Sequence, residues 1–199
     1  FAFNRHDTAD FNIDFDKIYF AKYENLNIVH LGSLMLSEEK GRVLAKRVAD
    51  KTKEIGAKLS FDVNFRKDIF RDFDAAKRAY EPFVKSADIV KFSEDELLDF
   101  TGISGIDAAA ESLCDKDKLI LVTLGKNGSA YYFNGEKGVV PSEYKCKSID
   151  TTGAGDAFFG AFLAAIENKE PTKENIVSAM RNGNEKGAKT TEFFGAIKL

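Results

Sequence analysis

The sequence predicts an α/β fold in which a mostly parallel sheet is covered by helices on both faces. The main observation is that short apolar runs typical of buried strands alternate with helix-like segments from about residue 27 to the end. The second is length, because 199 residues suit one domain with a substantial core. The third is that no internal repeat, low-complexity tract or linker divides the chain.

Each expected element has its own local signals. Strands are expected over residues 27–34, 58–63, 88–92 and 118–124, and a β-hairpin over residues 129–140. The hairpin turn is placed at Asn134 and Gly135, since Asn-Gly is a strong two-residue turn signal. Helices are expected over residues 37–56, 74–86, 93–101, 106–114, 153–168 and 171–187. Ser37 is the expected N-cap of the first helix, and Ser93 and Glu96 form a capping box at the third.

Composition and charge exclude several classes of protein. The net charge is −3 with acidic and basic residues interspersed, so no nucleic-acid-binding surface is indicated. Cys114 and Cys146 lie far apart without metal-ligand spacing, which favours free thiols in a reducing cytosol over a disulfide. His6 and His30 are isolated, so no zinc site is expected. No signal peptide or membrane span is recognisable, and we therefore expect a cytoplasmic protein without a membrane partner.

The most informative stretch is residues 150–156 (DTTGAGD), followed by an apolar run that continues to Asn168. This run is hydrophobic on nearly every face, which predicts a buried helix whose first turn contains two glycines and an acid. The free amides of a helix N-terminus, together with the positive end of the helix dipole, form an anion site. An aspartate beside a bound phosphate can take a proton from a hydroxyl group, so the pattern suggests phosphoryl transfer.

On the residues alone, other interpretations of this stretch stay open. Glycines and an Asp before an apolar helix are equally typical of an ordinary capped helix start. A dinucleotide-binding fingerprint is disfavoured, because its third glycine would fall at position 158 and Gly160 comes too late, and because residues 145–149 make a poor buried strand. An intramembrane aspartyl protease is also disfavoured, because the run between Asp156 and Glu167 is too short to span a bilayer.

Residues 150–158 (DTTGAGDAF) resemble the second signature of the ribokinase/PfkB family of carbohydrate kinases, and the resemblance extends along nearly the whole chain. It implies a ribokinase-like three-layer α/β/α sandwich that uses ATP and Mg²⁺. In such a kinase Asp156 binds the sugar hydroxyl and acts as its general base. Backbone amides stabilise the transferred phosphoryl group, and the resemblance places these amides at Gly153, Ala154 and Gly155. The family often binds K⁺ beside this loop, here through Asp150 and Thr152.

The resemblance also covers the start of the chain. Residues 1–5 (FAFNR) are similar to a strand of the family's β-sheet lid, whose arginine, Arg5 here, reaches the sugar; an exposed strand arginine is the alternative. We therefore divide the chain into a remnant lid strand, residues 1–13, and an α/β core with the nucleotide site, residues 14–199. Because the sequence begins with Phe1 in mid-strand, we expect the family's first strands and most of its lid to be missing.

Other segments resemble phosphate and metal motifs of the family. Residues 62–66 (DVNFR) are similar to the fructokinase pattern DPNYR, which gives Asn64 and Arg66 roles near the phosphates or the metal unless they only close a loop. Residues 93–96 align with an Asn-x-x-Glu motif whose Glu, Glu96 here, helps to hold the waters of Mg²⁺, although Ser93 replaces the Asn.

The resemblance places the nucleotide against two stretches, residues 123–128 and 180–188. The nucleotide-binding residues that it implies are Thr123, Gly125, Gly128, Asn184 and Gly187. An ordinary turn is the alternative for the first stretch, and a polar residue on a helix surface is the alternative for Asn184. Residues 195–197 match the family's closing loop.

Taken together, the resemblance implies ATP-dependent phosphorylation of a primary hydroxyl of a ketose. D-fructose is the expected acceptor, because residues 62–66 and residues 30–33 (HLGS) are similar to fructokinases. A 2-keto-3-deoxygluconate kinase, which shares the Arg5 pattern, is one alternative, and a non-catalytic kinase-like binding domain is another. Relatives commonly dimerise through the lid, so a homodimer is a further candidate.

Overall fold

One six-stranded sheet organises the structure, a computed structural model that describes residues 8–22, 25–66, 69–70 and 72–197. The strands lie in the sheet in chain order, and they are β1 (Ile28–Gly32), β2 (Lys58–Asp62), β3 (Ile89–Ser93), β4 (Leu119–Thr123), β5 (Ser129–Phe133) and β6 (Glu136–Val140). The first four strands are parallel, and the last two form an antiparallel hairpin. The expected mostly parallel sheet is therefore confirmed.

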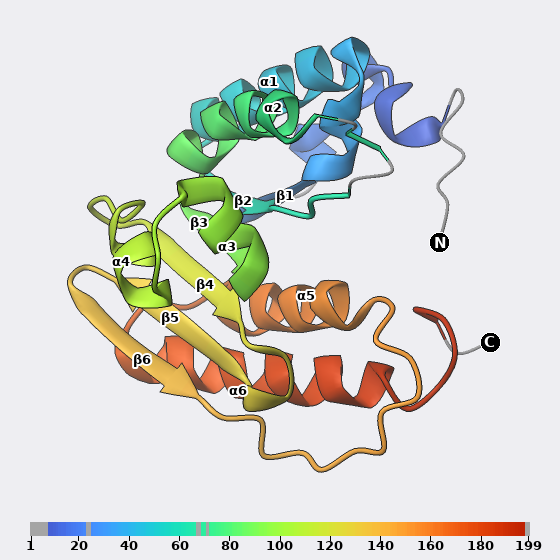
Figure 1. Cartoon of the computed structure of the whole chain (residues 1–199). Helices are drawn as coiled ribbons and strands as arrows, with labels where there is room; N and C mark the ends of the chain where they lie inside the picture. Colours follow the sequence, from blue (N-terminus) through green and yellow to red (C-terminus); the bar gives the residue numbers. More distant parts are fainter. Residues whose placement is uncertain (1–7, 23–24, 67–68, 71, 198–199) are drawn as a thin grey trace.

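Helices cover both faces of this sheet, which gives the expected three layers (Figure 1). One face carries α1 (Glu39–Glu54), α2 (Phe73–Ser86), α3 (Glu94–Thr101) and α4 (Ile106–Glu111). The other face carries α5 (Ala154–Ile166) and α6 (Lys173–Thr190). Short 3₁₀ turns complete the chain, and they are η1 (Ala9–Phe11), η2 (Phe15–Lys17), η3 (Phe20–Lys22), η4 (Ser33–Ser37) and η5 (Gly125–Asn127).

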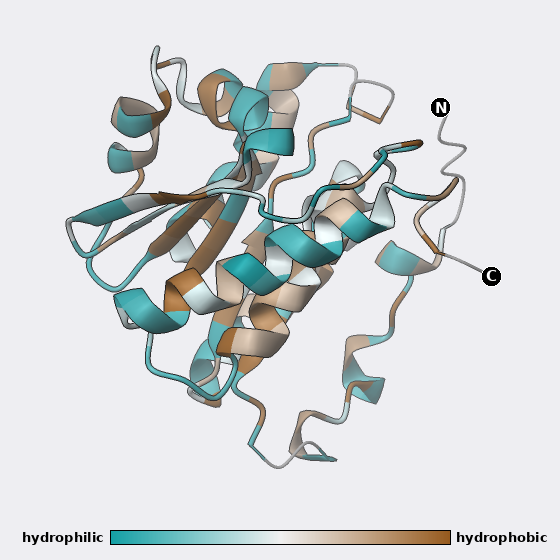
Figure 2. Ribbon diagram, turned by 90° about the horizontal axis from the view of Figure 1, so that it is seen from below, coloured by the Kyte–Doolittle hydropathy of each residue, from teal (hydrophilic) through white to brown (hydrophobic). Residues whose placement is uncertain are grey.

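The sheet separates two apolar cores. Along β4, Ile120 and Val122 pack with the side chains of α1 to α4, while Leu119 and Leu121 pack with those of α5 and α6. This alternation follows from the period of two in a strand, and both faces are apolar because both are covered. Burying a phenylalanine such as Phe162 contributes about 2–3 kcal/mol relative to exposing it. Seen from below, α6 turns a largely hydrophilic face outward (Figure 2).

The hairpin turn is confirmed at Asn134 and Gly135, which have φ angles of 48° and 79°. Two helix boundaries differ from the sequence prediction. Helix α1 begins after Glu38, because the five residues of η4 precede it and bury Leu36, so Ser37 ends a 3₁₀ turn and is not the N-cap. Helix α4 ends at Glu111, three residues before its predicted end.

Helices α5 and α6 pack closely together, and this contact corrects two further expectations. Helix α6 runs past Gly187 to Thr190. A Cβ at Gly187 would stand only 3.0 Å from the carbonyl oxygen of Ala154, so the glycine serves the contact with α5. Glycine is thus favoured there by packing and does not end the helix. Helix α5 is buried on one face only: its buried residues are Phe158, Phe159, Phe162 and Ile166, whereas Asp156, Gly160 and Ala164 are exposed.

The close approach of these two helices predicts opposite effects of two glycine substitutions. In Gly183→Ala the new Cβ would stand 2.7 Å from Cδ2 of Phe158, so we expect a loss of about 1–3 kcal/mol in the free energy of unfolding. Gly160→Ala on α5 is the matched control, because nothing lies within 4 Å and alanine should add roughly 0.5–1 kcal/mol. Urea unfolding measures both. Stabilisation by both alanines would contradict the described contact.

Candidate active site

The carboxyl ends of the parallel strands open into a cleft of about 940 Å³, the position where sheets of this kind place their ligands. Strand register explains why polar side chains gather there. Asp62 pairs with Lys91 and Ser93 pairs with Thr123 across adjacent strands. The cleft is lined by residues from β3, α3, the loops after β1, β2 and β4, and the start of α5, including Leu34, Asn64, Arg66, Lys91, Glu96, Thr123, Gly125, Thr152, Gly153, Gly155 and Asp156.

The first turn of α5 closes one wall of this cleft. Gly153 is the N-cap with φ of 77°, a conformation that favours glycine, and a Cβ there would stand 2.6 Å from Cβ of Ala196. The amides of Gly153, Gly155 and Asp156 donate to no acceptor within the described part of the chain, so they are available to an anion. The amide of Ala154 instead donates to the carbonyl of Thr151 at 3.2 Å. Ala154 is therefore removed from the predicted set of free donors, because the turn before the helix uses its N–H.

Asp150 organises the loop that precedes this helix. One carboxylate oxygen accepts from the Thr152 amide at 2.9 Å and from its hydroxyl at 2.7 Å, and the other accepts from the Gly195 amide at 2.9 Å. These hydrogen bonds lower the pKa of Asp150. The bond from the Gly195 amide has the largest effect, and the two bonds from Thr152 come next. The expected closing loop at residues 195–197 thus lies against the glycine turn, and a carboxylate joins the two segments.

Glu96 joins the loop after β2 to the start of α3. One carboxylate oxygen accepts from the Phe65 amide at 3.1 Å, and the other accepts from the Ser93 amide at 2.8 Å. With the bond from the Glu96 amide to the Ser93 hydroxyl, this confirms the predicted capping box. The loop is also fixed from the other side, because the buried Ser33 hydroxyl accepts from the Asn64 amide at 2.9 Å. Ser33 was not predicted as a site residue, since only the fold brings it to Asn64.

Three of the predicted nucleotide residues are not among those that line the cleft, and each has a packing contact in the fold. Gly128 has φ of 98°, and a Cβ there would stand 2.1 Å from the carbonyl oxygen of Val140. Asn184 is not a surface residue, because it is 8% exposed, accepts from the Ser129 hydroxyl at 2.9 Å and donates to the Val140 carbonyl at 2.9 Å. Gly187 belongs to the contact between α5 and α6. Thr123 and Gly125 do line the cleft.

Only residues 8–13 of the predicted lid segment, residues 1–13, lie within the described part of the chain. Residues 1–7, including Arg5, lie outside the described residues. Of the rest of that segment, residues 9–11 form the 3₁₀ turn η1 and not a strand.

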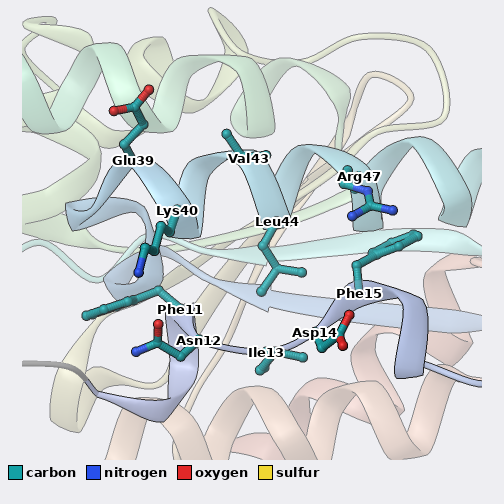
Figure 3. Close-up of a pocket in the computed structure, with 10 residues that line it drawn as sticks. All are labelled: Phe11, Asn12, Ile13, Asp14, Phe15, Glu39, Lys40, Val43, Leu44 and Arg47. Carbon is teal, nitrogen blue, oxygen red and sulfur yellow. The ribbon is translucent and has the colours of Figure 1, made fainter.

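A second hollow of about 540 Å³ lies between α1 and the segment from Phe11 to Phe15, and Figure 3 shows Leu44 and Arg47 of α1 facing it. It contains none of the predicted site residues.

Sequence reasoning missed a buried ion pair on the floor of the cleft. Lys91 Nζ lies 2.8 Å from Oδ1 of Asp62, and the two side chains are 7% and 5% exposed. Burial raises the pKa of Asp62 to about 6, although the Lys91 ammonium acts in the opposite direction. A signal was present in the sequence, because a lysine in an otherwise apolar strand, residues 89–92, is unusual.

Within the described residues, no helix is long and apolar enough to cross a bilayer, and no group of three His, Cys, Asp or Glu side chains is placed to hold a metal ion. A divalent metal held by phosphate oxygens and water, as Mg²⁺ commonly is, would have the side chains of Asn64, Glu94, Asp95 and Glu96 as oxygen-bearing neighbours in the same cleft.

The chain belongs to the pfkB family of carbohydrate kinases, since residues 1–198 match the family described as "pfkB family carbohydrate kinase". Fructokinase-1 of Zea mays is 37% identical over 203 residues, which cover 99% of this chain and 62% of that relative. The fructokinase of Vibrio cholerae O395 with fructose, ADP and a calcium ion has a TM-score of 0.84 at 29% identity, covering 92% of this chain and 60% of that one. A double mutant of the Vibrio enzyme with fructose, ADP and a potassium ion also gives a TM-score of 0.84 at 29% identity, covering 92% of this chain and 59% of that one. The chain therefore spans about three fifths of the length of these relatives.

The raised pKa of Asp62 predicts how stability depends on pH. Between about pH 4 and pH 6 the folded chain holds a proton that the unfolded chain has released, so the free energy of unfolding falls as the pH rises through this window. Asp62→Asn combined with Lys91→Met removes this titration without leaving either partner of the buried ion pair unpaired. We expect the wild type to lose stability relative to this double variant from pH 4 to 6, with no further change above pH 7. Urea unfolding at each pH measures the difference. A constant difference across the whole range would contradict the assignment.

Proposed function

We propose that the protein is an ATP-dependent sugar kinase that transfers the γ-phosphoryl group to a primary hydroxyl of a ketose, with D-fructose as the acceptor. One observation carries the proposal: the exposed carboxylate of Asp156 lies in the same helical turn as free backbone amides, within a cleft at the carboxyl ends of parallel strands. Membership of a carbohydrate kinase family supports this chemistry.

In this mechanism the first turn of α5 holds the phosphoryl group. Amides of Gly153, Gly155 and Asp156 donate to the phosphoryl oxygens, and the positive end of the helix dipole adds to their effect. Mg²⁺ bound with the nucleotide would neutralise phosphate charge, with Asn64, Arg66 and Glu96 nearby in the cleft. Thr123, the last residue of β4, and Gly125 line the cleft. A Cβ at Gly125 would meet nothing within 4 Å, so a nucleotide can approach the backbone there.

Asp156 provides the base. The acceptor hydroxyl oxygen forms a bond to the γ-phosphorus while the bond to the bridging oxygen of ADP breaks, and the hydroxyl proton passes to the Asp156 carboxylate. The helix fixes the base beside the amides, so the acceptor and the phosphoryl group meet in one geometry. Proton transfer and charge stabilisation therefore come from adjacent residues of a single helix turn.

Support for fructose comes from the relatives, since the maize protein is named a fructokinase and the Vibrio enzyme was crystallised with fructose. The potassium ion in one Vibrio structure supports a K⁺ site here at Asp150 and Thr152. A cytoplasmic location and a homodimer through the lid complete the proposal.

Asp156→Asn should abolish turnover and leave nucleotide affinity nearly unchanged, because it removes the proton acceptor and keeps the side-chain shape. Glu167→Gln is the matched control, since Glu167 is an exposed carboxylate at the other end of α5. Release of ADP by the full-length gene product measures turnover, and calorimetry measures nucleotide binding. Turnover by Asp156→Asn within about tenfold of the wild type would reject Asp156 as the base.

The acceptor is tested by offering D-fructose and 2-keto-3-deoxygluconate separately to the full-length gene product with ATP and Mg²⁺. We expect ADP release with fructose. Release with the keto acid alone would keep the mechanism and replace the substrate. No ADP release with either compound, while ATP still binds, would indicate another acceptor or a non-catalytic role.

A further inference from the structure

Lys91 is a buried cation that the proposed mechanism does not use. It lies in the third position of β3, and the whole residue is only 5% exposed. Its ammonium is held by one buried carboxylate, that of Asp62 on the neighbouring strand, at 2.8 Å. Lysine is almost never buried to this extent unless it is paired.

The surroundings of this ammonium are electrostatically unusual. A Cβ at Gly155 would stand 3.2 Å from Lys91 Nζ, so the cation packs directly against the first turn of α5. That turn is the positive end of the helix dipole, where a cation is unfavourable and an anion is stabilised. Two positive features therefore meet at one point of the cleft.

The second buried lysine of the described chain shows the ordinary arrangement. Lys118 is 8% exposed, and its Nζ donates to the carbonyls of Val84 and Lys85 at 2.7 Å each. These carbonyls end α2, the negative end of a helix dipole, so the cation is placed where the helix favours it. Lys91 instead lies at the N-terminal, positive end of α5, so packing against that helix does not explain why a cation is buried there.

A bound anion would resolve the conflict at Lys91. Asp62 offsets one positive charge, but the free amides of Gly155 and Asp156 add further positive potential on the cleft side. Burial is the main cause of the raised pKa of Asp62, and the nearby carboxylates of Glu96 and Asp156 also raise it, so the ion pair and the proposed base act on one another. The ion pair and the helix start thus form one electrostatic unit that faces the cleft.

We propose that Lys91, anchored by Asp62, is a positioning residue that supplies a fixed positive charge beneath the phosphoryl-binding turn of α5. The inference rests on the proposed function, because it assigns the charge to the phosphoryl group of that same site. It also gives a reason for glycine at position 155, since any side chain there would push against the ammonium.

The test uses a double variant, because Lys91→Met alone leaves Asp62 buried and unpaired and is expected to unfold. Lys91→Met with Asp62→Asn removes both charges and keeps similar volumes. Lys118→Met is the matched control, since it also removes a buried ammonium but at the end of α2. Circular dichroism establishes that each variant is folded, and calorimetry measures the affinity of each for magnesium tripolyphosphate and for adenosine.

We expect the folded double variant to lose about tenfold or more in tripolyphosphate affinity while its adenosine affinity stays within about twofold of the wild type. Lys118→Met should keep both affinities within about twofold, whatever its stability. In the full-length gene product, the double variant should also lower kcat by about tenfold or more with KM for the sugar unchanged. A folded double variant with the tripolyphosphate affinity and kcat of the wild type would overturn the inference and leave the pair a purely structural role.

Failure of the proposed function gives a different result. If the wild type binds tripolyphosphate but transfers phosphate to neither fructose nor the keto acid, the proposed acceptor is wrong, and the comparison of tripolyphosphate affinities still decides the role of Lys91. If the wild type does not bind tripolyphosphate, the inference about Lys91 is wrong. If the double variant does not fold, Lys91→Gln with Asp62→Asn gives the same comparison with a polar pair of similar size.

Discussion

The candidate site depends on how α5 lies against the sheet. Its buried face, formed by Phe158, Phe159, Phe162 and Ile166, fixes the helix on the side of the sheet opposite α1 to α4. The position of that face sets where the first turn points, and it places the free amides and Asp156 at the carboxyl ends of the strands. Burial of apolar surface, the largest favourable term in folding, therefore also positions the groups that we expect to bind phosphate.

Three polar contacts then hold the surrounding loops in place. Ser33 and Glu96 fix the loop after β2 from two sides, and Asp150 ties the closing loop to the glycine turn. Each contact uses side-chain oxygens to satisfy backbone amides that have no strand or helix partner. The cleft is thus built on hydrogen-bonded loops between rigid elements, which suits the proposed transfer of a phosphoryl group between two bound substrates.

The sequence was sufficient wherever the determining signal is local. Alternating apolar runs, the Asn134–Gly135 turn and the Ser93–Glu96 capping box all act within a few residues, and each is confirmed. It was insufficient where contacts are distant in the chain. The pairing of Asp62 with Lys91 depends on strand register, and the inward direction of Asn184 depends on the packing of α6 against the hairpin. Glycine at position 187 is likewise explained only by the neighbouring helix.

The most direct test of this account is a crystal structure of the chain with Mg²⁺ and a non-hydrolysable ATP analogue. The account predicts the terminal phosphate within hydrogen-bonding distance of the amides of Gly155 and Asp156, with the Asp156 carboxylate facing the open side of the cleft. A nucleotide whose phosphates lie elsewhere, such as in the hollow between α1 and the segment from Phe11 to Phe15, would contradict it.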